Sequence, residues 1–113
     1  MNVKTKYALN KLNCIYQGNN LFDDRGSVEH IIPENDSLTL NIGNLILLEE
    51  SLNNKAKDLS YEKKLPLYRG SGYKWVQSFA DINPEWDNTK IEDRAKEMAK
   101  EYYKKVFKKP IKG

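Results

Sequence analysis

Hydrophobic residues recur at helical spacing near both ends of the chain. Between residues 4 and 17 apolar side chains follow one another at intervals of three and four, which predicts an amphipathic helix. A longer stripe with the same spacing predicts a last helix, which Asp87 or Asn88 can cap. The members of this second stripe are Ile91, Ala95, Met98, Ala99, Tyr102, Val106 and Phe107.

The middle of the chain alternates short apolar runs with polar loops. The β-branched run at residues 27–31 predicts a strand, and Pro33 ends it because proline has no N–H to donate to a sheet. Residues 33–41 are polar and loop-like, and the apolar run 44–48 predicts a second strand. Residues 49–57 then look helical. The predicted order is strand, loop, strand, helix.

Two more helical segments are predicted after this unit. They cover residues 61–68, in spite of Pro66, and residues 73–82, with the glycine-rich residues 70–72 between them. The chain shows no internal repeat and no low-complexity linker. We therefore expect an α+β fold that is mostly helical.

Composition narrows the class of protein. A length of 113 residues fits one domain, and 39% hydrophobic residues can form its core. A charged fraction of 31%, with a mean hydropathy of −0.78, is typical of a soluble protein, and no apolar run approaches the about 18 residues of a membrane span. The first ten residues lack the apolar stretch of a secretory signal. The single cysteine, Cys14, excludes an internal disulfide, so the cytoplasm is the expected compartment.

Positive charge is concentrated near the C-terminus, although the net charge is only +3. A basic end suits a polyanionic partner such as a nucleic acid, and the alternative is a solvated helix face. The lysines of this region are Lys96, Lys100, Lys104, Lys105, Lys108, Lys109 and Lys112.

Three short features surround the only histidine. Glu29 and His30 lie on the first predicted strand, and Asn44 begins the second strand 14 residues after the histidine. Asn53 follows nine residues later on the predicted helix. Each feature alone is weak evidence for a catalytic site, because asparagine is common and a single histidine is more often structural than catalytic.

Together, "VEHIIP", "IGNLILL" and "SLNNKAKD" resemble the HNH endonuclease family in residue type, order and spacing. That family has a ββα-metal fold, in which a two-stranded hairpin packs on a helix. The resemblance implies His30 as general base, and Glu29 and Asn53 as ligands of Mg²⁺, which Mn²⁺ can replace. It also implies that Asn44 belongs to the catalytic site and orients His30 by holding its loop. The alternative for Asn44 is a plain turn asparagine.

The resemblance extends to most of the chain. "KYALNKLN", "YEKKLPLYRGSGY" and "EWDNTKIEDRAKEMA" are similar to the C-terminal nuclease domain of GmrSD-type, modification-dependent (type IV) restriction enzymes. This similarity implies a single nuclease domain over 1–113, with a ββα core at about 26–58 and surrounding helices within 4–17 and 60–109. It further implies DNA cleavage with little sequence preference, a role in restriction or phage defence, and a fused or partner NTPase-like targeting module.

The residue types suit phosphodiester hydrolysis. The unperturbed pKa of histidine, about 6.5, is that of a base working near neutral pH. Mg²⁺ is a hard ion that keeps several waters, so one carboxylate and one amide oxygen can hold it. The family usually has aspartate where this chain has Glu29. Strand alternation places Glu29 and His30 on opposite faces, so both can act at one site only if the strand bends or ends there.

Basic side chains outside the motif are candidate phosphate contacts, with solvated surface as the alternative for each. For Arg94, on the last helix, a structural salt bridge with a carboxylate such as Glu92 is preferred to a role in fixing the active-site loop. The candidate phosphate-binding residues are Lys55, Lys57, Lys63 and Arg69.

Two other functions stay open. A catalytically silent module could keep the ββα shape for nucleic-acid binding or assembly. The complete Glu-His-Asn-Asn set argues against this loss of catalytic activity. A ribonuclease is the other alternative, because the same residues do not distinguish DNA from RNA.

Overall fold

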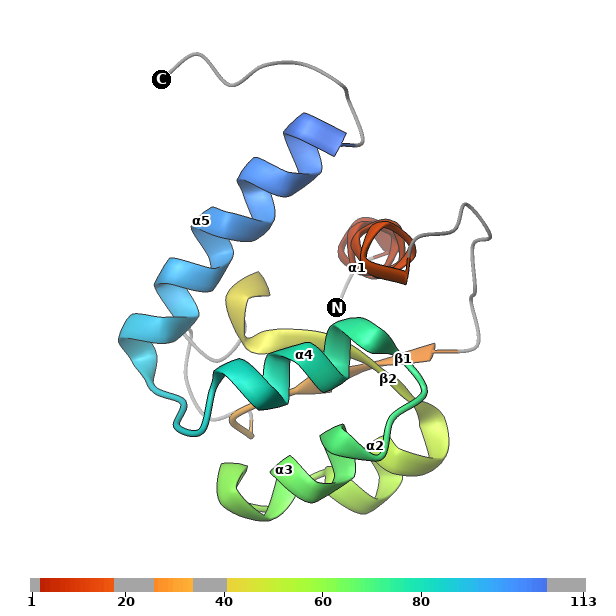
Figure 1. Cartoon of the computed structure of the whole chain (residues 1–113), viewed down its shortest axis with the longest axis vertical. Coiled ribbons are helices and arrows are strands. Elements are labelled where there is room, and N and C mark those ends of the chain that lie inside the picture. The colour runs from red at the N-terminus through yellow and green to blue at the C-terminus, as the bar shows by residue number, and fades with distance from the viewer. Residues whose placement is uncertain (1–2, 18–25, 34–40, 106–113) are drawn as a thin grey trace.

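The structure, a computed structural model, describes residues 3–17, 26–33 and 41–105 (Figure 1). Its architecture is α+β and mostly helical, as predicted. The elements are α1 (Val3–Gln17), β1 (Gly26–His30), the 3-10 helix η1 (Ile42–Asn44), β2 (Leu45–Glu49), α2 (Glu50–Ala56), α3 (Tyr61–Arg69), α4 (Lys74–Ile82) and α5 (Asn88–Lys105).

The two strands form an antiparallel hairpin, and α2 follows β2 directly, which confirms the predicted ββα order. Gly26 pairs with Glu49 at one end of the hairpin, and His30 pairs with Leu45 at the other. Helix α1 lies on one side of the hairpin, and α2 and α3 lie on the other (Figure 1). Because both faces are covered, residues 45–48 of β2 are all buried, which explains their unbroken apolar run.

The second strand begins one residue later than predicted, because a 3-10 turn precedes it. Asn44 was expected to begin that strand, but it ends η1, and β2 begins at Leu45. The side chain of Asn41 caps the turn by accepting a hydrogen bond from Gly43 N at 2.8 Å. Because α5 packs directly on η1, a Cβ atom at Gly43 would collide with the carbonyl oxygen of Ile91. Only glycine fits this approach.

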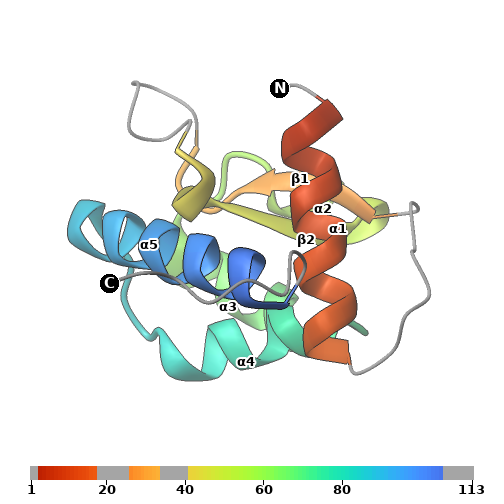
Figure 2. The ribbon, with the colours of Figure 1, turned by 90° about the horizontal axis from the view of Figure 1, so that it is seen from above.

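The last helix covers η1 and meets α1 near its own C-terminal end (Figure 2). Its predicted stripe is buried at Ile91 and Met98, whereas Ala99 is exposed, and Val106 and Phe107 lie outside the described residues. No helix among the described residues is long and apolar enough to cross a membrane.

Helices α3 and α4 pack together through aromatic side chains. Tyr61 and Tyr68 of α3 meet Phe79 of α4 with edge-on ring contacts, and Trp86, in the α4–α5 connection, closes the cluster against Phe79 at a centroid distance of 4.8 Å. Such contacts stabilise beyond the area that they bury. This cluster joins α3 to α4 and to the α4–α5 connection.

Candidate active site

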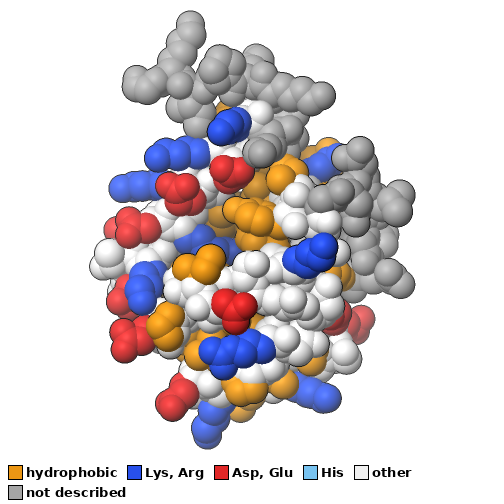
Figure 3. All heavy atoms as spheres, viewed as in Figure 1, with side chains coloured by type: hydrophobic (Ala, Val, Ile, Leu, Met, Phe, Trp, Pro, Cys, Tyr) orange, Lys and Arg blue, Asp and Glu red, His pale blue; other side chains and the backbone are white. Residues whose placement is uncertain are grey.

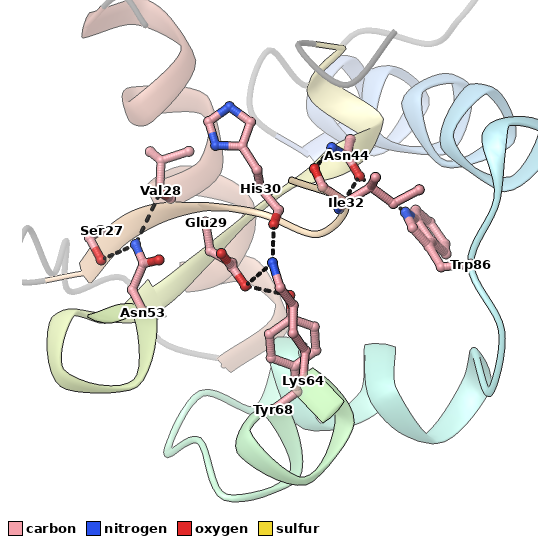
Figure 4. Close-up of polar contacts among 10 residues, drawn as sticks. All are labelled: Ser27, Val28, Glu29, His30, Ile32, Asn44, Asn53, Lys64, Tyr68 and Trp86. Atoms are coloured by element: carbon pink, nitrogen blue, oxygen red, sulfur yellow. Dashed lines mark hydrogen bonds and ion pairs between the residues drawn. The ribbon is translucent and has the colours of Figure 1, made fainter. Parts of the chain in front are cut away.

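His30 and Glu29 point to opposite sides of the hairpin. Strand β1 stays regular to its end, since Glu29 pairs with Ile46 and His30 with Leu45. Side chains therefore alternate, and the His30 ring lies on the other side of β1 from the Glu29 carboxylate (Figure 4). The bend that would allow both residues to act at one site is not seen within β1. The structure therefore does not bring the side chains of Glu29 and His30 together at one site.

The Glu29 carboxylate is buried against α3. Its side chain is only 2% exposed, and its Oε2 accepts a hydrogen bond from the Tyr68 hydroxyl at 2.7 Å. The Lys64 ammonium lies 3.1 Å from the same oxygen and is fully buried. Burial raises the pKa of Glu29 and lowers that of Lys64, while the hydrogen bond and ion pair between them oppose both shifts. Burial and the Glu29 charge raise the pKa of Tyr68, so its phenol stays protonated and can donate.

Lys64 was not singled out from the sequence, which drew attention to its neighbour Lys63. The structure places Lys63 at the surface and Lys64 in the interior. A usable signal was present, since Lys64, Leu65 and Tyr68 share one face of a helix with the spacing of a buried stripe. A lysine on an apolar helix face calls for a buried acid as its partner.

Asn44 clamps the chain that follows His30. Its side chain is fully buried, with Oδ1 accepting from Ile32 N at 2.9 Å and Nδ2 donating to Ile32 O at 2.9 Å. Its backbone oxygen accepts from Ile31 N at 2.8 Å. Three bonds thus fix the two residues after the histidine, which is a larger task than a plain turn asparagine performs.

Two residues from the C-terminal part hold this clamp in place. The Trp86 indole N–H donates to Asn44 Oδ1 at 3.2 Å (Figure 4), and the Arg94 guanidinium donates to Gly43 O at 2.9 Å and Leu45 O at 2.7 Å. Burial lowers the pKa of Arg94 to about 10, which leaves it charged at neutral pH. The hydrogen bonds of Arg94 within the described residues go to backbone carbonyls flanking Asn44, which favours the role in fixing this loop over the preferred salt bridge with a carboxylate such as Glu92.

Asn53 ties α2 to β1. Its Nδ2 donates to Ser27 Oγ at 2.8 Å and to Val28 O at 3.1 Å, and Ser27 Oγ in turn donates to Leu48 O at 3.1 Å. The amide nitrogen is therefore used to join the helix to the hairpin, which leaves Oδ1 as the atom that a cation could meet.

Replacing Asn53 with aspartate separates these two roles. A carboxylate has no N–H for Ser27 and Val28 and would place a negative oxygen beside the Val28 carbonyl, so we expect the Asn53→Asp variant to lose about 1–3 kcal/mol of unfolding free energy. Chemical denaturation measures the loss. A variant as stable as the parent, with tighter binding of a divalent ion, would instead support Asn53 as a metal ligand.

The four basic candidates lie at the surface. Lys55, Lys57 and Lys63 are exposed, and Arg69 Nε lies 3.9 Å from Asp81 Oδ1 in an exposed ion pair. On the face drawn in Figure 3, acidic and basic side chains are mixed along α5. The lysines beyond residue 105 lie outside the described part of the chain. These positions can meet phosphates, and their role in nucleic-acid binding stays a prediction.

The family of the chain follows from its sequence. A family model described as the C-terminal domain of GmrSD restriction endonucleases matches residues 2–101, so the chain belongs to this family. It is therefore placed among nuclease domains, and a restriction endonuclease domain implies DNA as its substrate. Searches of curated proteins and of solved structures each found no match.

Proposed function

We propose that this chain hydrolyses phosphodiester bonds of DNA with an HNH-type site in which His30 is the general base. The observation that carries this proposal is the fixed backbone at the histidine and directly after it. Asn44 holds residues 31 and 32, and Lys64 Nζ donates to the carbonyl oxygen of His30 at 2.6 Å. Such support is what a catalytic side chain at the end of a strand requires, because small misplacements are costly in rate.

The proton transfer can be written in full. The His30 imidazole takes a proton from water, and the resulting hydroxide oxygen forms a bond to phosphorus. The bond from phosphorus to the leaving oxygen breaks, and that oxygen takes a proton from solvent or from the imidazolium. Asn44 takes no proton in this scheme. It orients the histidine through the backbone.

Nucleases of this kind are generally metal-dependent, and the HNH resemblance predicts Mg²⁺ or Mn²⁺ on Glu29 and Asn53. When bound, such an ion neutralises charge on the scissile phosphate. The described residues fit this ligand pair only in part, because the Glu29 carboxylate is buried in an ion pair with Lys64, whereas Asn53 uses Nδ2 to join α2 to β1 and keeps Oδ1 for a cation. Nor do they include a group of three or more His, Cys, Asp or Glu side chains that could hold a metal ion. The metal-ligand assignment of Glu29 and Asn53 stays a prediction, and we assign no step to the ion.

We further propose that the isolated domain selects DNA weakly by sequence, and that a fused or partner NTPase-like module directs it in restriction or phage defence. The exposed Lys55 and Lys57 of the α2 region can supply affinity through phosphates, which carry no sequence information.

Replacing Lys55 and Lys57 with alanine tests that affinity. For each phosphate that the variant no longer binds, the plot of log affinity against log salt concentration should flatten by about one unit, equally for all DNA sequences. Fluorescence anisotropy at several salt concentrations measures the slope. Lys74, an exposed lysine at the start of α4, provides the matched alanine control. An unchanged slope in the double variant would show that both lysines are solvated surface residues that do not contact phosphates.

The decisive assay uses the purified chain with supercoiled plasmid and with RNA, each in Mg²⁺, in Mn²⁺ and in EDTA. We expect nicking and linearisation of the plasmid with divalent ion. Cutting of RNA alone would favour the ribonuclease, and binding without cutting of either substrate would favour the silent module. Both outcomes would overturn the proposed DNA hydrolysis.

A further inference from the structure

A buried cluster lies directly behind His30, on the side of β1 that faces α3. Lys64, fully buried, lies at its centre and has two acceptors, Glu29 Oε2 at 3.1 Å and His30 O at 2.6 Å (Figure 4). Tyr68, one helical turn later, donates to the same Glu29 oxygen at 2.7 Å. Two side chains of α3 thus fill the space to which Glu29 points.

The charges of this cluster compensate each other. An ammonium group removed from water needs both a countercharge and hydrogen-bond acceptors, and Glu29 supplies the first. The second acceptor is a backbone carbonyl, and it belongs to His30 rather than to any other residue of the strand. Helix α3 therefore contacts the backbone of the histidine through the lysine.

We infer that Lys64 is the resident cation of the Glu29 carboxylate and a positioning residue for His30, and that Glu29 does not bind a divalent ion. This inference rests on the proposed function, and it differs from the ligand role that the HNH resemblance predicts for Glu29. A divalent ion that took Glu29 Oε2 would compete with two donors already bound there. It would also lie close to a fixed positive charge, which disfavours it electrostatically.

The consequence for catalysis is indirect. Lys64 contacts the carbonyl of His30, while the imidazole lies on the opposite side of the strand (Figure 4). Loss of the lysine should therefore change where the base is held, and leave the affinity for substrate much as it was. The expected signature is a fall in kcat with little change in KM.

The main variant is the pair Glu29→Gln with Lys64→Met, in which no unpaired charge stays buried and the fold should persist. The amide introduced by Glu29→Gln keeps an acceptor for the Tyr68 hydroxyl, whereas His30 O loses its ammonium donor. We expect kcat to fall by roughly 10-fold to 100-fold. Tyr61→Phe is the matched control, since it removes a hydroxyl of the same helix that donates to Asn83 O and not to His30.

Three readouts test the inference. The double variant Glu29→Gln, Lys64→Met should have a lower kcat than the parent, whereas Tyr61→Phe should not. Both variants are measured well below their Tm values. The ¹³C chemical shift of the His30 carbonyl should differ from that of the parent in the double variant and should be unchanged in Tyr61→Phe. Mn²⁺ binding to the chain without DNA, followed by electron paramagnetic resonance, should be the same for the parent and for Glu29→Gln.

Two results would overturn the inference. Equal kcat values in the double variant and the parent would show that Lys64 does not position His30. A tenfold weaker Mn²⁺ affinity in a folded Glu29→Gln variant would restore Glu29 as a ligand. If the parent cuts no nucleic acid, the proposed function fails, while the carbonyl shift and the Mn²⁺ affinity still decide whether Lys64 holds His30 and occupies the Glu29 carboxylate.

Discussion

Cleavage by the His30→Ala variant is expected to be about 10²-fold to 10⁴-fold slower than cleavage by the parent, because that is the usual contribution of a general base. The fold should persist. His30 is the last residue of β1 and only half-buried, and its contacts with Lys64 and Leu45 use backbone atoms that alanine retains. Single-turnover cleavage of a plasmid at saturating enzyme measures the rate, and circular dichroism measures the fold.

Val28→Ala is the matched control for this experiment. Val28 lies two residues before His30, so its side chain is on the same side of the strand, and it is also partly buried against the core. The control should lose stability and keep its cleavage rate. If His30→Ala cuts as fast as the parent, His30 is not the base, and the proposed mechanism is wrong.

Breaking the buried ion pair should have the second large effect. Either Glu29→Gln or Lys64→Met alone leaves one charge buried without its partner, which typically costs about 3–5 kcal/mol of unfolding free energy. The double variant leaves no such charge and should be at least as stable as either single variant. Urea denaturation of the parent and the three variants completes the cycle.

The pH dependence of the two single variants should have opposite signs. Burial lowers the pKa of Lys64 from its ordinary 10.5, and Glu29 opposes that shift, so Glu29→Gln lowers the pKa further. A depressed pKa means stability that is lost as pH falls, and this variant should approach the parent as pH rises from 7 toward 10. Burial raises the pKa of Glu29 from 4.5, so Lys64→Met should approach the parent as pH falls from 7 toward 4.5.

Single variants that match the parent at pH 7, or two variants with the same pH trend, would contradict a buried charged pair. The measurement is the difference in unfolding free energy between variant and parent at each pH. Taking this difference removes the titration of groups that the two proteins share.

Local patterns in the sequence were enough to predict most elements. The amphipathic helices at both ends, the two strands and the helix after them are each specified by residues close together in the chain, through apolar spacing, proline and asparagine. The constellation around His30 was also visible, because two strands and the following helix are short and consecutive. These features predicted the order of the elements, and the HNH resemblance implied that they form a ββα core.

Contacts between distant segments decided the rest. Lys64 rather than Lys63 reaches the strand, 34 residues from His30 in sequence, and Arg94 reaches the carbonyl of Gly43 across 51 residues. Spacing along one helix shows which face is apolar, but it does not show which acceptors another segment presents to that face. The sequence by itself determined the elements, because they depend on neighbours within a few residues, and its resemblance to the HNH family supplied His30 as the candidate base. Only the tertiary structure decided the surroundings of Glu29, since burial and the charge that compensates it arise when α3 packs against β1.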